Sequence, residues 1–341
     1  MNITLPPAGL CRNAALSRRA LLSAAVGLVA APALLRGLPA QAAAPELGPT
    51  TQTFQRLRLG AFEVTSLLDA SAMIDGPWPI VGEDRPAGEV EALMQANLLP
   101  PTRFRPGFSP TLVNTGRELV LFDTGNGENG FVPPPAGGFL ARSLAAAGYA
   151  PEQVDVVVLT HAHPDHVGGL LSGGKPAFAK ARYVIGATEF DFWKSDRPLA
   201  APKESNEYGS ALVFRSHVLP LADRMSFIAA NGEVVPGIRA VAAHGHTPGH
   251  LAFHVESEGK RLLVWGDCAH HEVASLARPD WHALFDQDKA AGVATRRKIY
   301  DMAATDRLAV AGYHTSFPSL GYVERRDEGY RWLPLTYQLA L

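Results

Sequence analysis

The chain has 341 residues, of which 47% are hydrophobic and 19% are charged, and it contains two cysteines. This length and composition suit one large or two ordinary domains with a full core, and they exclude a disordered chain, a fibre and a disulfide-stapled scaffold. The formal net charge is −2, but residues 1–42 carry four arginines and no acid, so the remainder is mildly acidic. An acidic body argues against nucleic acid as a partner.

The N-terminal segment has the form of an export signal. Two adjacent arginines, residues 18 and 19, precede an apolar stretch over 20–35, and residues 40–42 read Ala-Gln-Ala, a small-x-small cleavage pattern. This arrangement resembles a signal read by the twin-arginine export machinery. A stable membrane anchor is disfavoured because the stretch is short and contains Pro32. We expect a signal over 1–42, a linker over 43–51, and a folded domain over 52–341 that resides in the periplasm.

Strand-like segments separated by turn signals begin soon after this linker and suggest β-hairpins. The segments are Phe54–Leu59, Phe62–Leu68, Thr111–Asn114 and Glu118–Phe122. A connection over 76–108, rich in Pro, Gly and charge, lies between them and contains a short helix candidate over 89–98. Long connections of this kind are often binding loops, so Phe108 is a candidate for contact with a substrate, although an ordinary loop role fits equally well.

Residues 125–130 read GNGENG, which matches the dinucleotide-binding fingerprint. The fingerprint must open a helix, whereas here Phe131 and three prolines at 133–135 follow, and such a run cannot start one. We therefore expect a loop with Phe131 as a candidate pocket residue. Asp123, where the preceding strand ends, is either an ordinary strand-end residue or a carboxylate that orients a metal-bound imidazole.

The most informative stretch is 160–166, which reads THAHPDH and follows the buried strand predicted over 154–159. Side chains alternate along extended backbone, so His161 and His163 point the same way. Pro164 suits the first turn of a helix, where Asp165 and His166 diverge by about 100°. Two ligand pairs aimed at two neighbouring points are what a dinuclear metal site requires.

The second half places three more ligand-type residues where predicted strands stop. His246 follows the strand over 238–243, Asp267 follows 262–265, and His314 follows 308–311. The other predicted elements are strands 182–185, 234–235 and 251–255, and helices 138–148, 188–193 and 289–304. Because the carboxyl ends of strands carry the sites of α/β sheets, we expect these residues to join the first motif.

These seven residues allow a chemical hypothesis. One divalent ion is held by His161, His163 and His246, the other by Asp165, His166 and His314, and Asp267 bridges them with its two oxygens. Nitrogen and carboxylate donors without thiolate suit zinc, with manganese, iron or cobalt as alternatives. Two cations bring the pKa of a shared water to around neutrality, which supplies a bridging hydroxide as nucleophile. Asp165 can then carry a proton to the leaving oxygen.

The His-x-His-x-Asp-His motif with the later His, Asp and His resembles the metallo-β-lactamase superfamily. The resemblance covers roughly residues 52–341 and implies an α/β fold, an αββα sandwich with a dinuclear site along one edge. Segments 112–116, 237–238, 244–250, 316–318 and 329–331 look most like methyl parathion hydrolase and related esterases or lactonases. The likeness implies hydrolysis of an ester, lactone or phosphotriester, an aromatic-lined pocket and a homodimer. It places Trp193, otherwise core or pocket, in the pocket wall, and Asp123 behind a metal-bound imidazole.

The chain also departs from family patterns. Common β-lactamases carry a Cys ligand where this chain has Asp267, and Cys268 should point the other way along the strand. The position three residues after that ligand, where related lactonases present a Tyr, holds His270, which either acts at the substrate or only forms hydrogen bonds in its loop. His250 is expected behind the ligands. An exported protein also lacks access to the cytoplasmic glutathione thioester of the second glyoxalase, a relative that shares all seven ligands.

We therefore predict a dinuclear-metal hydrolase of a small ester or lactone, with phosphotriester cleavage as an incidental activity. The alternatives are a β-lactam or thioester hydrolase of the same fold, and a non-catalytic periplasmic metal-binding protein. Metal stoichiometry separates catalysis from a structural role, because a structural site is closed by four protein ligands.

Overall fold

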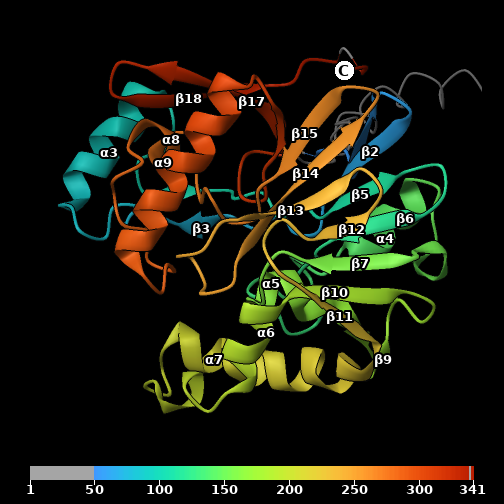
Figure 1. Ribbon diagram of the computed structural model, residues 1–341. Helices are drawn as coiled ribbons and strands as arrows, with labels where there is room; N and C mark the ends of the chain where they lie inside the picture. Colours follow the sequence, from blue (N-terminus) through green and yellow to red (C-terminus); the bar gives the residue numbers. More distant parts are fainter. Residues whose placement is uncertain (1–49, 338) are drawn as a thin grey trace, which may run out of the picture. The chain divides into compact units, whose positions relative to one another are not determined.

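The computed structural model describes residues 50–337 and 339–341 (Figure 1). The predicted signal over 1–42, and all but the last two residues of the predicted linker over 43–51, lie outside the described residues. Residues 51–341 cluster as one unit. Among the described helices, none has both the length and the apolar character that crossing a bilayer requires.

Two sheets of seven strands each dominate the described residues. The first sheet has the spatial order β1 (Phe54–Leu59), β2 (Phe62–Leu67), β5 (Thr111–Asn114), β6 (Leu119–Phe122), β7 (Val156–Leu159), β10 (Arg182–Gly186), β11 (Met225–Ile228). The second has the order β12 (Glu233–Val235), β13 (Ile238–Ala242), β14 (Leu251–Ser257), β15 (Lys260–Val264), β16 (Ala309–Ala311), β17 (Leu320–Arg326), β18 (Gly329–Pro334). Two small ribbons pair β3 (Ile74–Asp75) with β4 (Arg103–Phe104), and β8 (Leu171–Ser172) with β9 (Lys175–Pro176).

Helices fill the connections between these strands. The α-helices are α3 (Ala87–Ala96), α4 (Leu140–Ala146), α5 (Pro164–Val167), α6 (Ala187–Lys194), α7 (Asn206–Val213), α8 (Ala274–Ala277) and α9 (Lys289–Thr305). A π-helical turn, Phe214–Val218, extends α7, and short 3₁₀ turns lie at Pro151–Gln153, Gly168–Leu170, Pro198–Ala200 and Leu219–Arg224.

Alternation along β7 shows how the layers form. Val156 and Val158 belong to a core shared by the two sheets, where they meet residues of β13 and β14 such as Phe253. Val157 and Leu159 point the opposite way and pack with α4 and α6. A strand buried on both faces reads as a continuous apolar run, which is why VVVL is a central strand.

The second sheet is covered on its outer face by α9, drawn in orange (Figure 1). Ile299 and Tyr300 of that helix pack against Leu263 and Trp265. Cys268 lies in the same outer cluster and so points away from the metal-ligand residues, as expected, although it stands in the turn after β15 and not on the strand itself. Helix, sheet, sheet and helix layers give the αββα sandwich of the metallo-β-lactamase fold, which confirms the predicted fold class.

Most predicted elements appear within two residues of their expected bounds, but several were missed. The sequence interpretation did not include α7, β11, or the hairpin of β17 and β18. The sheet topology determines where the ligand-type residues gather. Strand β7 is parallel to β6 and β10, and β15 is parallel to β16. Their carboxyl ends meet along one edge of the sandwich.

Candidate metal centre

The THAHPDH segment leaves β7 in extended backbone and turns into the short helix α5 at His163. Pro164 occupies the first helical position, where the missing N–H of proline costs nothing. The His163 carbonyl accepts hydrogen bonds from the N–H groups of His166 and Val167, which fixes the turn. His161 and His166 are fully buried, and His163 and Asp165 are nearly so. The local sequence therefore builds a buried ligand loop whose turn is fixed by backbone hydrogen bonds.

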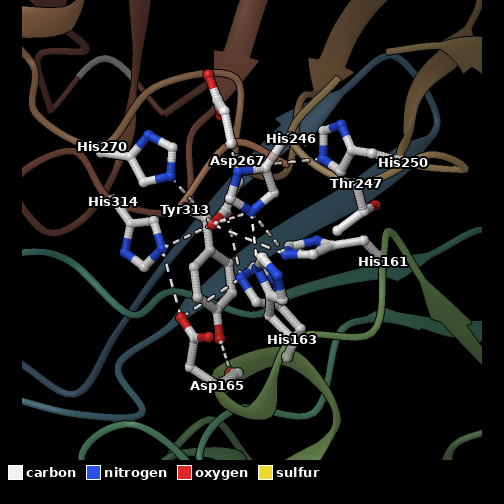
Figure 2. Close-up of polar contacts among 12 residues, drawn as sticks. His161, His163, Asp165, His246, Thr247, His250, Asp267, His270, Tyr313 and His314 are labelled. Carbon is white, nitrogen blue, oxygen red and sulfur yellow. Dashed lines mark hydrogen bonds and ion pairs between the residues drawn. The ribbon is translucent and has the colours of Figure 1, made fainter. Parts of the chain in front are cut away.

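Three histidines and one carboxylate form the first ligand group. His246 Nε2 lies 3.2 Å from His161 Nε2 and 2.8 Å from His163 Nδ1. The Asp267 carboxylate approaches the same point, with Oδ2 3.3 Å from His246 Nε2. In Figure 2 these side chains point inward toward one another from separate segments of the chain. The group is the first of the two predicted ligand sets, with Asp267 added.

The second ligand group shares that carboxylate. Asp267 Oδ1 lies 3.0 Å from His166 Nε2, and Asp267 Oδ2 lies 3.0 Å from His314 Nε2. Asp165 Oδ2 lies 3.4 Å from His314 Nε2. Asp267 thus faces both groups, the position expected of a bridging ligand. We call His161, His163, Asp165, His166, His246, Asp267 and His314 the metal-ligand cluster.

The donor set fits two divalent cations. Within each group, the potential ligand atoms all lie within 4.8 Å of one another. His166 Nε2 and Asp267 Oδ1 are buried 3.0 Å apart, but the angles of this contact do not make it a hydrogen bond and neither atom has another partner, although buried polar atoms are normally paired. Burial lowers the pKa of His161 and His246 well below 6.5 and that of His163 to about 4, which leaves neutral rings with free lone pairs.

The other two histidines of the cluster, His166 and His314, lie closer to carboxylates. Burial pushes the pKa of His166 down, but the carboxylates of Asp267, Asp165 and Asp123 more than offset it and raise the pKa well above 6.5. Burial also lowers the pKa of His314, and Asp267 again outweighs it, so the net direction is upward. Such a concentration of carboxylate around imidazole attracts cations.

Asp123 lies behind His166. Its Oδ2 is 2.8 Å from His166 Nδ1, and its two oxygens accept hydrogen bonds from the N–H and the hydroxyl of Thr160, each at 2.8 Å. The backbone of Asp123 has φ +61°, a conformation rare for a residue other than glycine and often found at functional sites. The arrangement leaves His166 Nε2 directed at Asp267.

Hydrogen bonds of two further histidines, His314 and His250, orient the remaining ligand loops. His314 Nδ1 donates to the Gly107 carbonyl at 2.9 Å, which directs Nε2 toward Asp267. His250 Nδ1 donates to the Ala243 carbonyl at 2.8 Å, so its Nε2 accepts from the Asp267 N–H at 3.1 Å. His250 therefore supports the backbone that carries the shared carboxylate.

Glu189 was not anticipated from the sequence. Its buried carboxylate accepts from the Ala162 N–H at 2.9 Å and from the Thr247 hydroxyl at 2.6 Å, so it joins the ligand loops of both halves. It also accepts from the Gly249 N–H and from Trp193 Nε1. The available signal was a carboxylate on the same helical face as Phe190 and Trp193, a face too apolar for an unpaired charge.

The placement of Trp193 in the pocket wall is corrected by the structure. Trp193 is fully buried in the core between the first sheet and its helices, and it is absent from the residues that line the cavity. Its indole N–H points inward because Glu189 accepts from it at 2.7 Å. The ring still contacts one ligand, His163, edge to face at 5.8 Å between centroids.

A cavity of about 310 Å³ opens above the metal-ligand cluster. Phe108 and Phe131 line it as expected, and Phe285 lines it without having been predicted. We call its hydrophobic side the apolar wall, formed by Ile74, Ile80, Phe104, Pro106, Phe108, Phe131, Val213 and Phe285. Its polar members away from the cluster are uncharged, namely Asn129, Ser205, Asn206 and Ser210.

His270 stands between the cluster and the apolar wall. It lines the cavity, its ring stacks on His314 at 5.7 Å, and its Nε2 lies 3.7 Å from Asp267 Oδ2. Both ring nitrogens are buried without a hydrogen-bond partner. A loop histidine with only a local bonding role would have one, so the geometry favours contact with a bound molecule.

Comparisons with known proteins agree with this geometry. The family described as "Metallo-beta-lactamase superfamily" matches residues 109–304, more than half of the chain. The structure of AidC, described as a dizinc quorum-quenching lactonase in complex with a homoserine product, is 25% identical with a TM-score of 0.76, covering 84% of this chain and 98% of AidC. Hydrolase AbOPH of the beta lactamase superfamily is 26% identical with a TM-score of 0.77, covering 85% and 100%.

Curated relatives match over shorter stretches. An N-acyl homoserine lactonase from Bacillus sp is 30% identical over 119 residues, which is 35% of this chain. The match spans about 40% of that relative's own length.

Proposed function

Because this chain belongs to the metallo-β-lactamase superfamily, we propose that it is a dinuclear metal hydrolase that cleaves an uncharged lactone or carboxylic ester with an apolar body. One observation carries the proposal: seven ligand-type side chains converge from both sheets at the base of a largely apolar cavity. The descriptions of AidC and of the Bacillus relative as lactonases support the same class of reaction.

The metal-ligand cluster would hold two divalent ions. Zinc is the first choice because AidC is described as a dizinc enzyme and because imidazole and carboxylate suit zinc, while manganese, iron and cobalt accept the same donors. When bound, such ions polarise a carbonyl group and bring the pKa of a water close to neutrality.

The chain's own side chains supply the remaining functions. Asp165 lines the cavity beside His314, so its carboxylate is placed to hold and pass a proton to the leaving oxygen. His270 offers a ring N–H to a substrate oxygen, because neither of its nitrogens bonds within the protein. The apolar wall binds the substrate body and excludes water from the reacting carbonyl, which strengthens these polar contacts.

The charge of the cavity supports uncharged substrates. Beyond the metal-ligand cluster, no Lys or Arg is found among the residues that line it. A substrate whose body carries a carboxylate away from the metal ions, such as a glutathione thioester, would therefore bury a negative charge against the apolar wall without a cationic side chain to pair it. The non-catalytic alternative requires a closed site, and this cluster opens onto a cavity.

Neutral phosphotriesters meet the same requirements of charge and shape. The likeness of several segments to methyl parathion hydrolase supports including them, as an incidental activity of the same site. They differ from esters in the geometry of the reacting centre, so the two classes need separate measurement.

A substrate panel tests the proposal. Zinc-loaded protein is assayed with γ-lactones carrying acyl chains of increasing length, with aryl esters, with phosphotriesters, and with a lactone whose chain ends in a carboxylate. We expect turnover of the uncharged lactones and esters, a kcat/KM that rises with chain length, and a marked loss for the carboxylate analogue. Protein treated with a chelator is the control. Equal rates with and without metal, or faster turnover of the charged analogue, would contradict the proposal.

We further propose that the mature protein acts in the periplasm as a homodimer. The basis is the twin-arginine-like segment at 18–35 and the resemblance to dimeric hydrolases. Replacing Arg18 and Arg19 by Lys should retain the protein in the cytoplasm, as measured by cell fractionation. Light scattering of the mature chain should give twice the monomer mass, and a monomer would contradict the dimer.

A further inference from the structure

A buried ion pair, Asp286 with Arg296, lies behind His246, which belongs to the first ligand group. His246 Nδ1 is 3.1 Å from Asp286 Oδ1, and Asp286 Oδ2 accepts a hydrogen bond from Arg296 Nη1. All three residues are 3% exposed. The sequence interpretation assigned nothing to Asp286 or Arg296.

Arg296 is fixed as firmly as the carboxylate it holds. It lies on α9, where its Nε donates to the Pro279 carbonyl at 3.1 Å and its Nη2 donates to the Trp281 carbonyl at 2.9 Å. With Nη1 on Asp286, the guanidinium is bonded on three sides and cannot swing away. Asp286 is therefore held in one position.

The backbone brings this pair against the ligand loop. The N–H of Gln287 donates to the His246 carbonyl at 3.0 Å, and the N–H of Asp288 donates to the Gly245 carbonyl at 3.0 Å. Two glycines permit the approach. A Cβ on Gly292 would lie 2.3 Å from Asp286 Oδ2, and one on Gly245 would lie 2.3 Å from the Gly292 nitrogen.

A buried ion pair is a poor source of stability, because desolvation offsets much of the attraction between the charges. Its placement suggests a different use. An acceptor at Nδ1 fixes the tautomer and the ring orientation of a metal-binding histidine, so that Nε2 presents its lone pair. His246 Nε2 faces His161 and His163, as the first ligand group requires.

We propose that Asp286 is a positioning residue that fixes His246 for the first metal ion, and that Arg296 is the charge partner that keeps Asp286 in place. The inference rests on the proposed metal centre. It predicts that the first ion depends on Asp286 in the way that the second depends on Asp123, which contacts His166. The two carboxylates differ in their partners, since Asp123 is held by the uncharged Thr160.

Two double variants separate orientation from charge and packing. Asp286→Leu with Arg296→Met removes both charges and the acceptor, and Asp286→Asn with Arg296→Met removes both charges but keeps an oxygen for His246. Leu and Asn are close to Asp in shape. The Leu variant should fold, because apolar residues of similar volume generally replace a buried ion pair without loss of stability. The Asn variant should fold because Asn has the size of Asp and keeps an oxygen for His246 Nδ1. Circular dichroism and thermal melting check this.

Metal binding is then measured without reference to activity, by zinc stoichiometry, competition with a chelating dye and the absorption spectrum of the Co²⁺-loaded protein. The Leu variant should bind one of its two ions about 10- to 100-fold more weakly, with an altered Co²⁺ spectrum, while the Asn variant stays close to wild type. Asp123→Leu and Asp123→Asn are the matched comparisons for the other ion, because the first removes the acceptor for His166 Nδ1 and the second keeps an oxygen there. The single variant Arg296→Met should melt below the Asn double variant, because it leaves a buried carboxylate unpaired.

The outcomes are distinguishable. If wild-type protein binds two ions and the folded Leu variant binds both equally well, the inference fails and the proposed function stands. Equal losses in the Leu and Asn variants would likewise overturn it, because the acceptor oxygen would then be irrelevant. If wild-type protein binds no metal, both the inference and the proposed function fail.

Discussion

The metal-ligand cluster and the apolar wall are two parts of one cavity with different construction. The cluster residues lie just beyond strand ends, two of them in the short helix α5, and they are nearly or fully buried. His166, His246 and His314 each have a protein acceptor for the ring nitrogen turned away from Asp267. The wall comes from loops, the β3–β4 ribbon and α7. Phe131 is 49% exposed and meets Phe108 and Phe285 only through ring contacts at 6.4 and 5.9 Å. The two sheets thus hold the residues of the reaction in place, whereas the substrate is selected by the segments of the apolar wall, which are held less firmly.

The strongest test of this difference removes the shared ligand. Asp267→Ala should lower kcat/KM by roughly 10³-fold or more, since several kcal/mol of transition-state stabilisation depend on the ions that Asp267 joins. Metal content should fall in parallel. A folded variant with two bound ions and normal turnover would place Asp267 outside the reaction, and Cys268→Ser, next in the chain but directed into the outer core, serves as the control.

At the boundary between cluster and wall, His270→Phe keeps a planar ring but removes both nitrogens. If His270 donates to a substrate oxygen, kcat should fall by about 10²-fold, within the usual range for a positioned acid or donor. Metal stoichiometry should not change, which distinguishes this variant from loss of a ligand. Unaltered rates on every ester and lactone would assign His270 a purely structural role.

Glu189→Gln tests how the cluster is supported from behind. The amide presents an NH₂ group to a site where four donors converge, so at least one buried donor loses its acceptor, at a cost of about 1–3 kcal/mol. We expect a fall in melting temperature of a few degrees and a loss of activity of roughly tenfold. Glu207→Gln on α7 is a matched control for the change of charge. A melting temperature equal to that of wild type would show that the four bonds are dispensable.

The smallest effect should come from the wall. Phe131→Ala removes a half-exposed ring, so the loss is about 1 kcal/mol, or roughly fivefold in KM, for substrates with long apolar chains. Short substrates and kcat should be nearly unaffected. A large fall in kcat would mean that the wall also positions the reacting carbonyl, and the contrast between the two parts of the cavity would disappear.

The metal-ligand cluster could be predicted from the sequence, whereas much of what surrounds it could not. The ligand residues could be assigned because four lie within six positions of a single strand exit, and because His246, Asp267 and His314 each follow a strand that alternation or apolar runs reveal. The αββα fold followed from the resemblance that those residues carry. Local patterns contained enough information for both.

Contacts across long sequence separations were not predictable in this way. Glu189 meets Thr247, and Asp286 meets His246, across 58 and 40 residues, and no local pattern reports such pairing. Trp193 was assigned to the pocket wall on the family resemblance alone, whereas in the structure its indole N–H donates to Glu189 and the ring packs in the core. Phe285 was missed because its loop has no periodicity.

The metal-ligand cluster spans the seam between the two sheets. The first half supplies His161, His163, Asp165 and His166, and the second supplies His246, Asp267 and His314, with the Leu251 N–H donating to the Thr160 carbonyl across the join at 3.0 Å. Neither half holds a complete ligand set for either ion. Enzymatic turnover should therefore report the docking of one half on the other, and it should vanish in denaturant as soon as they part, even while each retains secondary structure of its own.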